Sequence, residues 1–259
     1  MTLAVAVLGL GEAGGTIASG LAAEGCDVRG WDPDTARDAS GVERTATPEE
    51  AVVGALLVLC LATAGQALTA ATSVLPVLEA GQLYADLNTT APALERELAT
   101  AIAPTGAAFA DVALLGGVPA RGVRTPALAS GDGAERFAEL MRPLGMPVEV
   151  VGSEPGDAAG LKLLRSVFVK GLAAAVLESL GAASRRGADD WLRGEIAGVI
   201  GEQLLERLLS GSITHAERRH NEMNAAADYL RELGVEPRVA EAAAGWLRQL
   251  ADEKRTRPA

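Results

Sequence analysis

The chain has 259 residues, of which 49% are hydrophobic and only 3% are aromatic, and its formal net charge is −11. This hydrophobic content is sufficient for a folded core, which excludes a wholly disordered chain. The negative charge disfavours nucleic acid and anionic membrane surfaces as partners, because both are themselves negatively charged.

The cysteines indicate the redox compartment of the protein, and the apolar runs indicate whether it could cross a membrane. Cys26 and Cys60 lie within apolar runs and form no recognisable motif, so we expect reduced thiols in a cytoplasmic protein. We find no run of about 18 apolar residues and expect no membrane span. The apolar N-terminus lacks the basic start of a signal peptide and leads into a glycine-rich loop, which indicates a strand.

The first 150 residues alternate short apolar runs with Ala-rich segments of helical period. The predicted strands are residues 3–9, 26–32, 55–62, 81–88, 107–115 and 146–152, and the clearest helices between them are 14–25 and 92–102. This alternation predicts an α/β fold, a Rossmann-type doubly wound parallel sheet with helices on both faces.

The sequence changes character after residue 152, where no strand pattern is evident. Breaks near 187, 210–212 and 234–237 predict about four helices. We therefore predict two domains, a dinucleotide-binding domain at 1–154 and an all-α domain for substrate binding and dimerisation at 155–259.

A glycine-rich loop follows the first predicted strand. Its residues are Gly9, Leu10, Gly11, Glu12, Ala13 and Gly14, in the pattern G-x-G-x-x-G. In this pattern the glycines permit a tight turn and close approach of a pyrophosphate, which rests on the helix N-terminus. The alternative is a glycine-rich turn that binds no ligand.

Asp32 ends the second predicted strand, near the offset expected for an acid that binds the ribose of a dinucleotide. Pro33 and Asp34 follow, and acidic residues repel the 2′-phosphate of NADP. We therefore expect NAD to be preferred over NADP, with Arg37 as the one nearby cation that could reverse this preference.

Two further loops should lie at the carboxyl ends of strands, where open α/β sheets bind ligands. The cofactor-binding candidates there are Leu61, Ala62 and Thr63 in one loop and Asn88 and Thr89 in the other. Thr90 precedes Ala91 and Pro92 and is a candidate helix N-cap.

The order of these motifs resembles the β-hydroxyacid dehydrogenase superfamily, which includes 3-hydroxyisobutyrate dehydrogenases, 6-phosphogluconate dehydrogenases and, more distantly, imine reductases. The resemblance covers most of the chain and is carried by GLGEAG, DLNTTAP, DVALLGGVPARG and GDAAGLKLLRS. The stretches GGVPARGVRTPALASG, KLLRSVFVKGL and ERRHNEM are most similar to a phosphogluconate dehydrogenase-like subgroup whose C-terminal domain has no assigned function.

The resemblance implies that Lys162 is the catalytic lysine and that Ser166 stands where the family usually has asparagine. Val169 replaces a glutamate that helps decarboxylation in 6-phosphogluconate dehydrogenases, which disfavours that reaction here. The other implied contacts are Gly116 and Gly117 with a substrate carboxylate, and Thr89 and Asn88 with substrate and nicotinamide.

Lys162, Ser166 and Lys170 are four residues apart, so on a helix they share one face, with Arg165 beside them. One interpretation is an ordinary solvated face. The other, which the resemblance favours, is a catalytic cluster that attracts an anionic substrate. There, partial burial and neighbouring cations would lower the pKa of Lys162 and suit it to general acid/base catalysis.

The chain contains two histidines, His215 and His220, in the stretch THAERRH. Thr214 and Glu217 read as a capping box at the start of a helix. A face formed by His215, Arg218, Arg219 and Glu222 is either solvated and ion-paired or part of the substrate pocket, to which Arg218 would contribute. We expect no metal site, because no spacing typical of metal ligands appears.

The sequence thus predicts an NAD(P)-dependent oxidoreductase. It would transfer a hydride between nicotinamide and a small hydroxy acid, or its keto or semialdehyde form, with Lys162 as general acid/base. The alternatives are an imine reductase-like enzyme, which does not need the lysine, and a nucleotide-binding regulatory protein without catalysis. We also expect a homodimer, because the helical half carries more Leu and Ala than it can cover alone.

Overall fold

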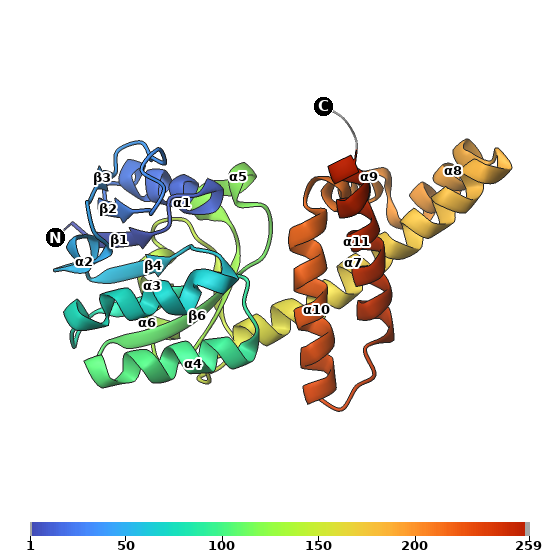
Figure 1. Cartoon of the computed structure of the whole chain (residues 1–259). Helices are drawn as coiled ribbons and strands as arrows, with labels where there is room; N and C mark the ends of the chain where they lie inside the picture. Colours follow the sequence, from blue (N-terminus) through green and yellow to red (C-terminus); the bar gives the residue numbers. More distant parts are fainter. Residues whose placement is uncertain (1, 257–259) are drawn as a thin grey trace. The chain divides into compact units, whose positions relative to one another are not determined.

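The computed structural model describes residues 2–256 and divides the chain into two compact units, Met1–Lys162 and Leu163–Ala259 (Figure 1). Each unit has its own hydrophobic cores. The division falls inside a long helix, whereas the sequence places the boundary at residues 154 and 155, before that helix; the domain limits stay a prediction.

The first unit is built on an eight-stranded sheet in the order β3-β2-β1-β4-β5-β6-β7-β8. The strands are β1 Ala4–Leu8, β2 Asp27–Trp31, β3 Glu43–Arg44, β4 Leu57–Cys60, β5 Leu83–Asp86, β6 Ala108–Leu114, β7 Ala127–Ser130 and β8 Val148–Val150. The order of the first six strands is that of a Rossmann fold, which confirms the predicted fold class.

Two of these strands, β3 and β7, were not predicted from the sequence, and β7 runs antiparallel to β6. The expectation of a wholly parallel sheet is therefore wrong at this one pairing. β7 has the sequence ALAS, which lacks β-branched and aromatic residues, and it is a strand because its neighbours on both sides offer pairing partners.

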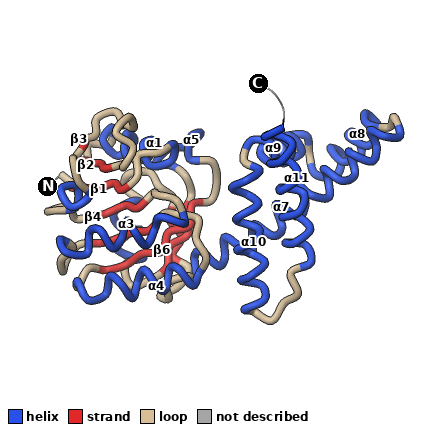
Figure 2. The backbone as a smooth tube through the Cα atoms, viewed as in Figure 1, coloured by secondary structure: helices blue, strands red, loops and turns tan. Residues whose placement is uncertain are grey.

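Helices cover both faces of the sheet (Figures 1 and 2). They are α1 Glu12–Ala23, α2 Pro48–Val52, α3 Ala67–Val74, α4 Pro92–Ile102, α5 Val118–Arg121 and α6 Ala134–Met141. Strand residues alternate between two cores: Val5 and Val7 of β1 pack with α1 and α6, whereas Ala6 and Leu8 pack with α2, α3 and α4. Because these strands are buried on both faces, their sequences are continuously apolar.

The described residues of the second unit form helices joined by short loops, and no strand (Figure 2). The chain there forms α7 Asp157–Arg186, which begins in the first unit, then α8 Asp189–Ile200, α9 Glu202–Thr214, α10 Ala216–Glu232 and α11 Arg238–Thr256. This is one helix more than predicted, because α8 and α9 are separated at Gly201 and α9 continues through residues 210–212. The predicted capping box is also wrong: Thr214 ends α9, and no side chain caps α10.

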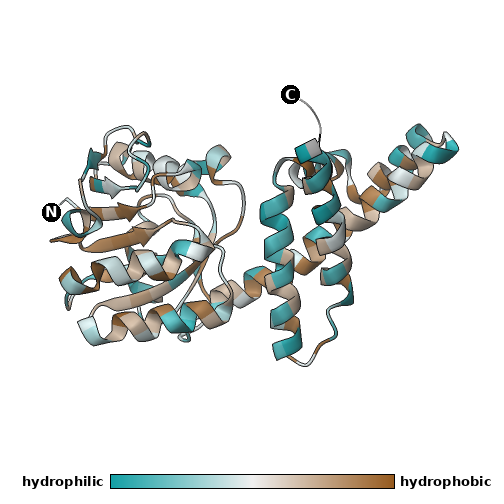
Figure 3. Ribbon diagram, in the orientation of Figure 1, coloured by the Kyte–Doolittle hydropathy of each residue, from teal (hydrophilic) through white to brown (hydrophobic). Residues whose placement is uncertain are grey.

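One helix, α7, is long and apolar enough to cross a membrane by length and composition alone. The expectation that no segment reaches this length is therefore wrong. Three of its residues, Leu163, Ala173 and Val176, are buried in the two cores of the second unit, whereas only 28% of its most apolar window is buried. Figure 3 shows the apolar residues spread along the helix.

Candidate active site

The glycine-rich loop joins β1 to α1 in a geometry that requires glycine at two positions. Gly9 has φ of +99°, and a Cβ there would lie 2.5 Å from the Leu61 carbonyl oxygen. A Cβ on Gly14 would overlap the carbonyl of Gly9. The sequence therefore closes this turn so tightly that strand, loop and helix are in backbone contact.

The start of α1 is suited to bind an anion. Its N-cap, Gly11, offers no side-chain cap to the first N–H groups of the helix. A groove of about 480 Å³ runs beside it, lined by the glycine loop and by residues 36–40. The open helix terminus, the glycine turn and the groove fit the pyrophosphate of a dinucleotide.

Asp32 is buried, and both of its carboxylate oxygens accept backbone hydrogen bonds. Oδ2 accepts from Leu10 N at 2.7 Å, and Oδ1 accepts from Asp34 N at 2.9 Å. The side chain thus connects the glycine loop to the loop after β2. A carboxylate has further acceptor capacity, which is what a ribose hydroxyl would use.

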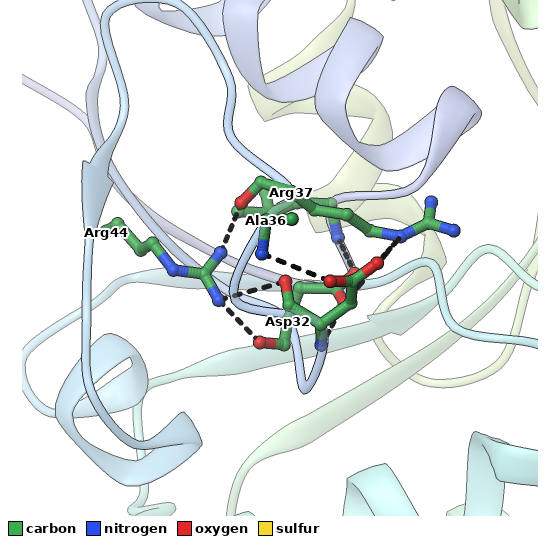
Figure 4. Close-up of polar contacts among 6 residues, drawn as sticks. Asp32, Ala36, Arg37 and Arg44 are labelled. Atoms are coloured by element: carbon green, nitrogen blue, oxygen red, sulfur yellow. Dashed lines mark hydrogen bonds and ion pairs between the residues drawn. The ribbon is translucent and has the colours of Figure 1, made fainter.

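Two arginines organise the loop between β2 and β3 (Figure 4). Arg44, which the sequence analysis missed, donates to the carbonyls of Asp32, Asp34 and Arg37 at 2.7, 3.2 and 2.5 Å. Arg37 pairs with Asp34 at 3.3 Å and lies 4.0 Å from Asp32. The cation that could attract a 2′-phosphate therefore already has a carboxylate partner.

The two loops after β4 and β5 lie at the same sheet edge as the glycine loop. Leu61 is buried against Gly9, and Thr63 is exposed. Asn88 is buried, and its Nδ2 donates to Asp86 at 2.6 Å and to Cys60 Sγ at 3.4 Å. Its Oδ1 has no hydrogen-bond partner among the described residues, so a buried acceptor is left for a ligand donor.

The predicted catalytic lysine reaches the loop after β5. Lys162 Nζ, on the second turn of α7, donates to Thr89 Oγ1 at 2.9 Å. The structure thus brings together two residues that the sequence separates by 73 positions. The prediction that Thr90 is the N-cap of α4 is wrong. Ala91 has that position, and the Thr90 hydroxyl donates a hydrogen bond to Glu95 instead.

Three buried carboxyl groups, Asp86, Glu95 and Asp111, lie behind this loop and were missed by the sequence analysis. Burial raises the pKa of Asp86 to about 6. Burial and the charges of Asp86 and Asp111 raise the pKa of Glu95 to about 11, so Glu95 is protonated near neutrality. The only sequence signal was a lone acid in each of the apolar strands LYAD and AFADVAL.

Asp111, in β6, holds the beginning of α7. Its Oδ2 accepts from Ser130 Oγ, Gly156 N and Ala159 N, each at 3.0 Å. Burial raises the pKa of this carboxyl, while these three hydrogen bonds and the charge of Lys162 act against the rise.

In the second unit, Ser166 and Lys170 do not form a solvated face. Ser166 is 1% exposed and donates to Glu222 at 2.5 Å, and Lys170 Nζ donates to both at 2.9 Å. Burial lowers the pKa of Lys170, the Glu222 carboxylate opposes this, and Arg219 and Arg218 add to the lowering. The exposed residues of this stretch of α7 include Leu161, Leu164, Phe168 and Arg165.

His220 has a packing role. Its Nδ1 lies 2.9 Å from the Ala244 carbonyl of α11, and its Nε2 lies 3.1 Å from Asn224 Nδ2. The carbonyl can only accept, so Nδ1 carries the proton and the ring joins α10 to α11. His215 and Arg218 are exposed, as are Gly116 and Gly117 in the turn after β6. Among residues 2–256, no group of three His, Cys, Asp or Glu side chains could hold a metal ion.

Family models match two regions of the chain. Residues 4–152 match the NAD binding domain of 6-phosphogluconate dehydrogenase, and residues 183–250 match a domain of unknown function. A curated relative, an uncharacterized 28.5 kDa protein of Methanothermus fervidus, is 30% identical over 132 residues, which cover 50% of this chain and 51% of the relative. The match therefore spans about half the length of that relative.

Solved structures share the architecture of the whole chain. MTH1747, a conserved protein of unknown function described as structurally similar to 3-hydroxyacid dehydrogenases, is 31% identical, with a TM-score of 0.76 and coverage of 96% of this chain and 97% of its own. A 3-hydroxyisobutyrate dehydrogenase of Mycobacterium tuberculosis, solved with L-serine, is 21% identical, with a TM-score of 0.82 and coverages of 97% and 94%. A reductive aminase of Aspergillus terreus, solved with NADPH, cyclohexanone and allyl amine, is 18% identical, with a TM-score of 0.67 and coverages of 98% and 95%. The last two likenesses concern the fold.

Proposed function

The chain belongs to the family of the NAD binding domain of 6-phosphogluconate dehydrogenase, and on that basis we propose that it is an NAD(P)-dependent oxidoreductase. Its substrate would be a small hydroxy acid or the corresponding keto or semialdehyde form. The observation that carries the proposal is the hydrogen bond from Lys162 Nζ to Thr89 Oγ1, at 2.9 Å, at the sheet edge that carries the glycine loop.

The first unit has candidate groups for three parts of the cofactor. The N-terminus of α1 would hold the pyrophosphate, Asp32 the adenosine ribose, and the unpartnered Oδ1 of Asn88 a donor at the nicotinamide end. We propose NAD as the preferred cofactor, because Arg37 is paired with Asp34 beside a second carboxylate. When bound, the cofactor accepts or supplies the hydride.

Lys162 would transfer the proton. In oxidation its neutral amine would take the proton of the substrate hydroxyl as the hydride leaves the same carbon. In reduction its ammonium would donate that proton to the developing alkoxide. Thr89 Oγ1 would orient Nζ. Gly116, Gly117, Arg165 and Arg218 remain our candidates for binding an anionic substrate.

The second unit would contribute through Ser166, Lys170 and Glu222. Because Glu222 already accepts from both side chains, Lys170 would act by orienting Ser166 rather than as a free charge for the substrate. We also propose that this unit forms the interface of a homodimer.

Substitution of Lys162 tests the catalytic assignment. Turnover is first established with a panel of small hydroxy acids, by following NADH formation. Lys162→Ala should then lower kcat by about 100-fold or more, the usual scale for loss of a general acid or base. Lys162→Arg should be nearly as damaging, because a guanidinium does not give up its proton near neutrality. NADH affinity, measured by fluorescence, should hardly change.

Lys254→Ala is the matched control, because Lys254 is an exposed lysine of α11. It should keep wild-type kcat. Full turnover by Lys162→Ala would remove Lys162 from the mechanism, and turnover of imines but not hydroxy acids would favour the imine reductase alternative. Tight NADH binding without turnover of any keto acid, semialdehyde or imine would favour a regulatory protein.

A further inference from the structure

The buried carboxylate of Asp111 takes no part in the proton transfer described above, yet it meets the helix that carries Lys162. It lies in β6 and is 1% exposed. A charged group in a buried strand is costly unless hydrogen bonds and an opposite charge compensate it. Three groups donate hydrogen bonds to the Asp111 carboxylate, and Lys162 supplies the opposite charge.

Two of the three donors to Asp111, Gly156 N and Ala159 N, lie at the start of α7. Ala159 N is one of the first N–H groups of the helix and donates to Asp111, and Ala158 N donates to Ser130 Oγ at 3.0 Å. Ser130 in turn donates to Asp111. Side chains from β6 and β7 therefore cap α7 in place of a residue of the helix itself, and the carboxylate lies at the positive end of the helix dipole.

The same segment sets the position of Lys162. Because α7 is continuous, seating its first turn on β6 fixes the height and rotation of its second turn. From there Lys162 Nζ reaches Thr89 Oγ1, on the loop that follows β5. Asp111, which holds the start of α7, lies in β6, and Thr89, which Lys162 reaches, follows β5. These two strands are paired neighbours in the sheet.

The other ionisable groups near Asp111 in the first unit belong to the same buried cluster. Asp86 lies in β5 and Glu95 in α4, and the raised pKa of Glu95 leaves it neutral near pH 7. From β7 the neighbouring side chain is the uncharged hydroxyl of Ser130.

We propose that Asp111 is a positioning residue for Lys162, whose carboxylate seats the first turn of α7 so that Nζ meets Thr89 Oγ1 and whose charge stabilises the ammonium form of Lys162. The ammonium form is the proton donor for reduction. The catalytic consequence rests on the proposed function, whereas the effect on Lys162 itself does not.

The chain has only three lysines, Lys162, Lys170 and Lys254, so lysine labelled at the side chain gives three NMR signals. Replacement of each lysine by arginine assigns them. In Asp111→Asn, the midpoint of the Lys162 titration should fall by about one pH unit or more, the scale of a nearby opposite charge. The midpoints of Lys170 and Lys254 should not move.

Ser130→Ala is the matched control, because it removes two hydrogen bonds of the same cluster, those with Asp111 and with Ala158 N, and no charge. Its Lys162 midpoint should stay near the wild-type value. A folded Asp111→Asn protein that binds NADH and has an unchanged Lys162 midpoint would overturn the charge part of the proposal and leave Asp111 a purely structural group.

Asp111→Glu keeps the charge and covers the case in which Asp111→Asn does not fold. Its longer side chain displaces the carboxylate from the three donors, so the Lys162 signal should shift and kcat should fall about tenfold while the titration midpoint stays. A wild-type Lys162 signal with wild-type kcat would overturn the positioning role. If Lys162→Ala itself retains turnover, the proposed mechanism fails, and the lysine titration still reports on Asp111.

Discussion

Glu95 is a carboxyl group without exposure to water, and its Oε2 has no hydrogen-bond donor among the described residues. Asp86 is close enough to interact with it strongly, and its own pKa is raised by burial. The missing donor at Oε2 and the nearness of Asp86 are both explained if the Glu95 carboxyl is protonated and its O–H group donates a hydrogen bond to Asp86. Two ionised carboxylates would repel each other there.

This proton makes the stability of the protein depend on pH in a defined direction. Below about pH 4.5, the ordinary pKa of the group, Glu95 is protonated in the folded and the unfolded chain. Above it, only the unfolded chain ionises until the folded pKa of about 11 is reached, so the free energy of unfolding falls as pH rises. One such group contributes up to about 1.4 kcal/mol per pH unit.

Glu95→Gln should remove this dependence, because the glutamine amide stays neutral and can donate to Asp86 in the same way. Urea unfolding between about pH 5 and pH 8 should show the variant gaining stability relative to wild type as pH rises. Glu97→Gln, on the exposed side of the same helix, should run parallel to wild type. Parallel curves for Glu95→Gln as well would mean that Glu95 is ionised in the folded protein.

The sequence could single out Lys162, Thr89 and Asn88 as candidates, because these residues stand in motifs. It could not indicate the carboxyl cluster. In PALERELATAI, Glu95 and Glu97 look alike, and only the sheet under α4 buries one and exposes the other. Likewise, nothing local shows that Glu222 would meet Ser166 across 56 residues.

The loop between β2 and β3 is the element that should decide which cofactor binds. In the cofactor site that we propose, Asp32 and Asp34 would repel the 2′-phosphate of NADP, and Arg37 is paired with Asp34. Arg44 holds the shape of the loop, since its guanidinium donates to three backbone carbonyls.

We expect kcat/KM to be higher with NAD than with NADP. Asp32→Ala should narrow the difference between the two values of kcat/KM and weaken the binding of both cofactors. Arg44→Ala is the comparison that separates charge from shape: it should raise KM for both cofactors and leave their ratio near wild type. A wild-type preference for NADP that is lost in Arg37→Ala would reverse the assignment and make Arg37 the phosphate ligand.

Element by element, the periodic segments were predicted well and the irregular ones were not. The helix predicted at residues 92–102 has those limits as α4, and the resemblance to β-hydroxyacid dehydrogenases with an unassigned C-terminal domain is confirmed. The count of helices in the second unit was wrong, because the break at Gly201, which has φ of +82°, was not predicted, and the break at His215 has no glycine or proline to mark it.

For the molecule as a whole, the second unit has more apolar surface than its own packing covers. Only 28% of the most apolar window of α7 is buried, and α8 has no buried residue. Large exposed side chains lie on both helices: Phe168 at 72%, Trp191 at 67% and Val199 at 85% exposure. An apolar surface that extends over two successive helices is a candidate interaction surface. A second copy of the chain is the simplest occupant, because it brings the same surface and most oligomers are symmetric.

We therefore expect light scattering at micromolar concentration to give twice the mass of one chain. Val199→Asp should shift this equilibrium toward monomer, because a charge placed in an apolar interface must be desolvated without a partner. Val53→Asp is the matched control: it makes the same change at another exposed valine that follows a helix of the first unit, and it should leave the mass unchanged. A wild-type monomer would show that α7 and α8 are covered by something other than a second copy. If Val199→Asp remained fully dimeric, the interface would have to exclude the end of α8, and Phe168 of α7 would be the next position to charge.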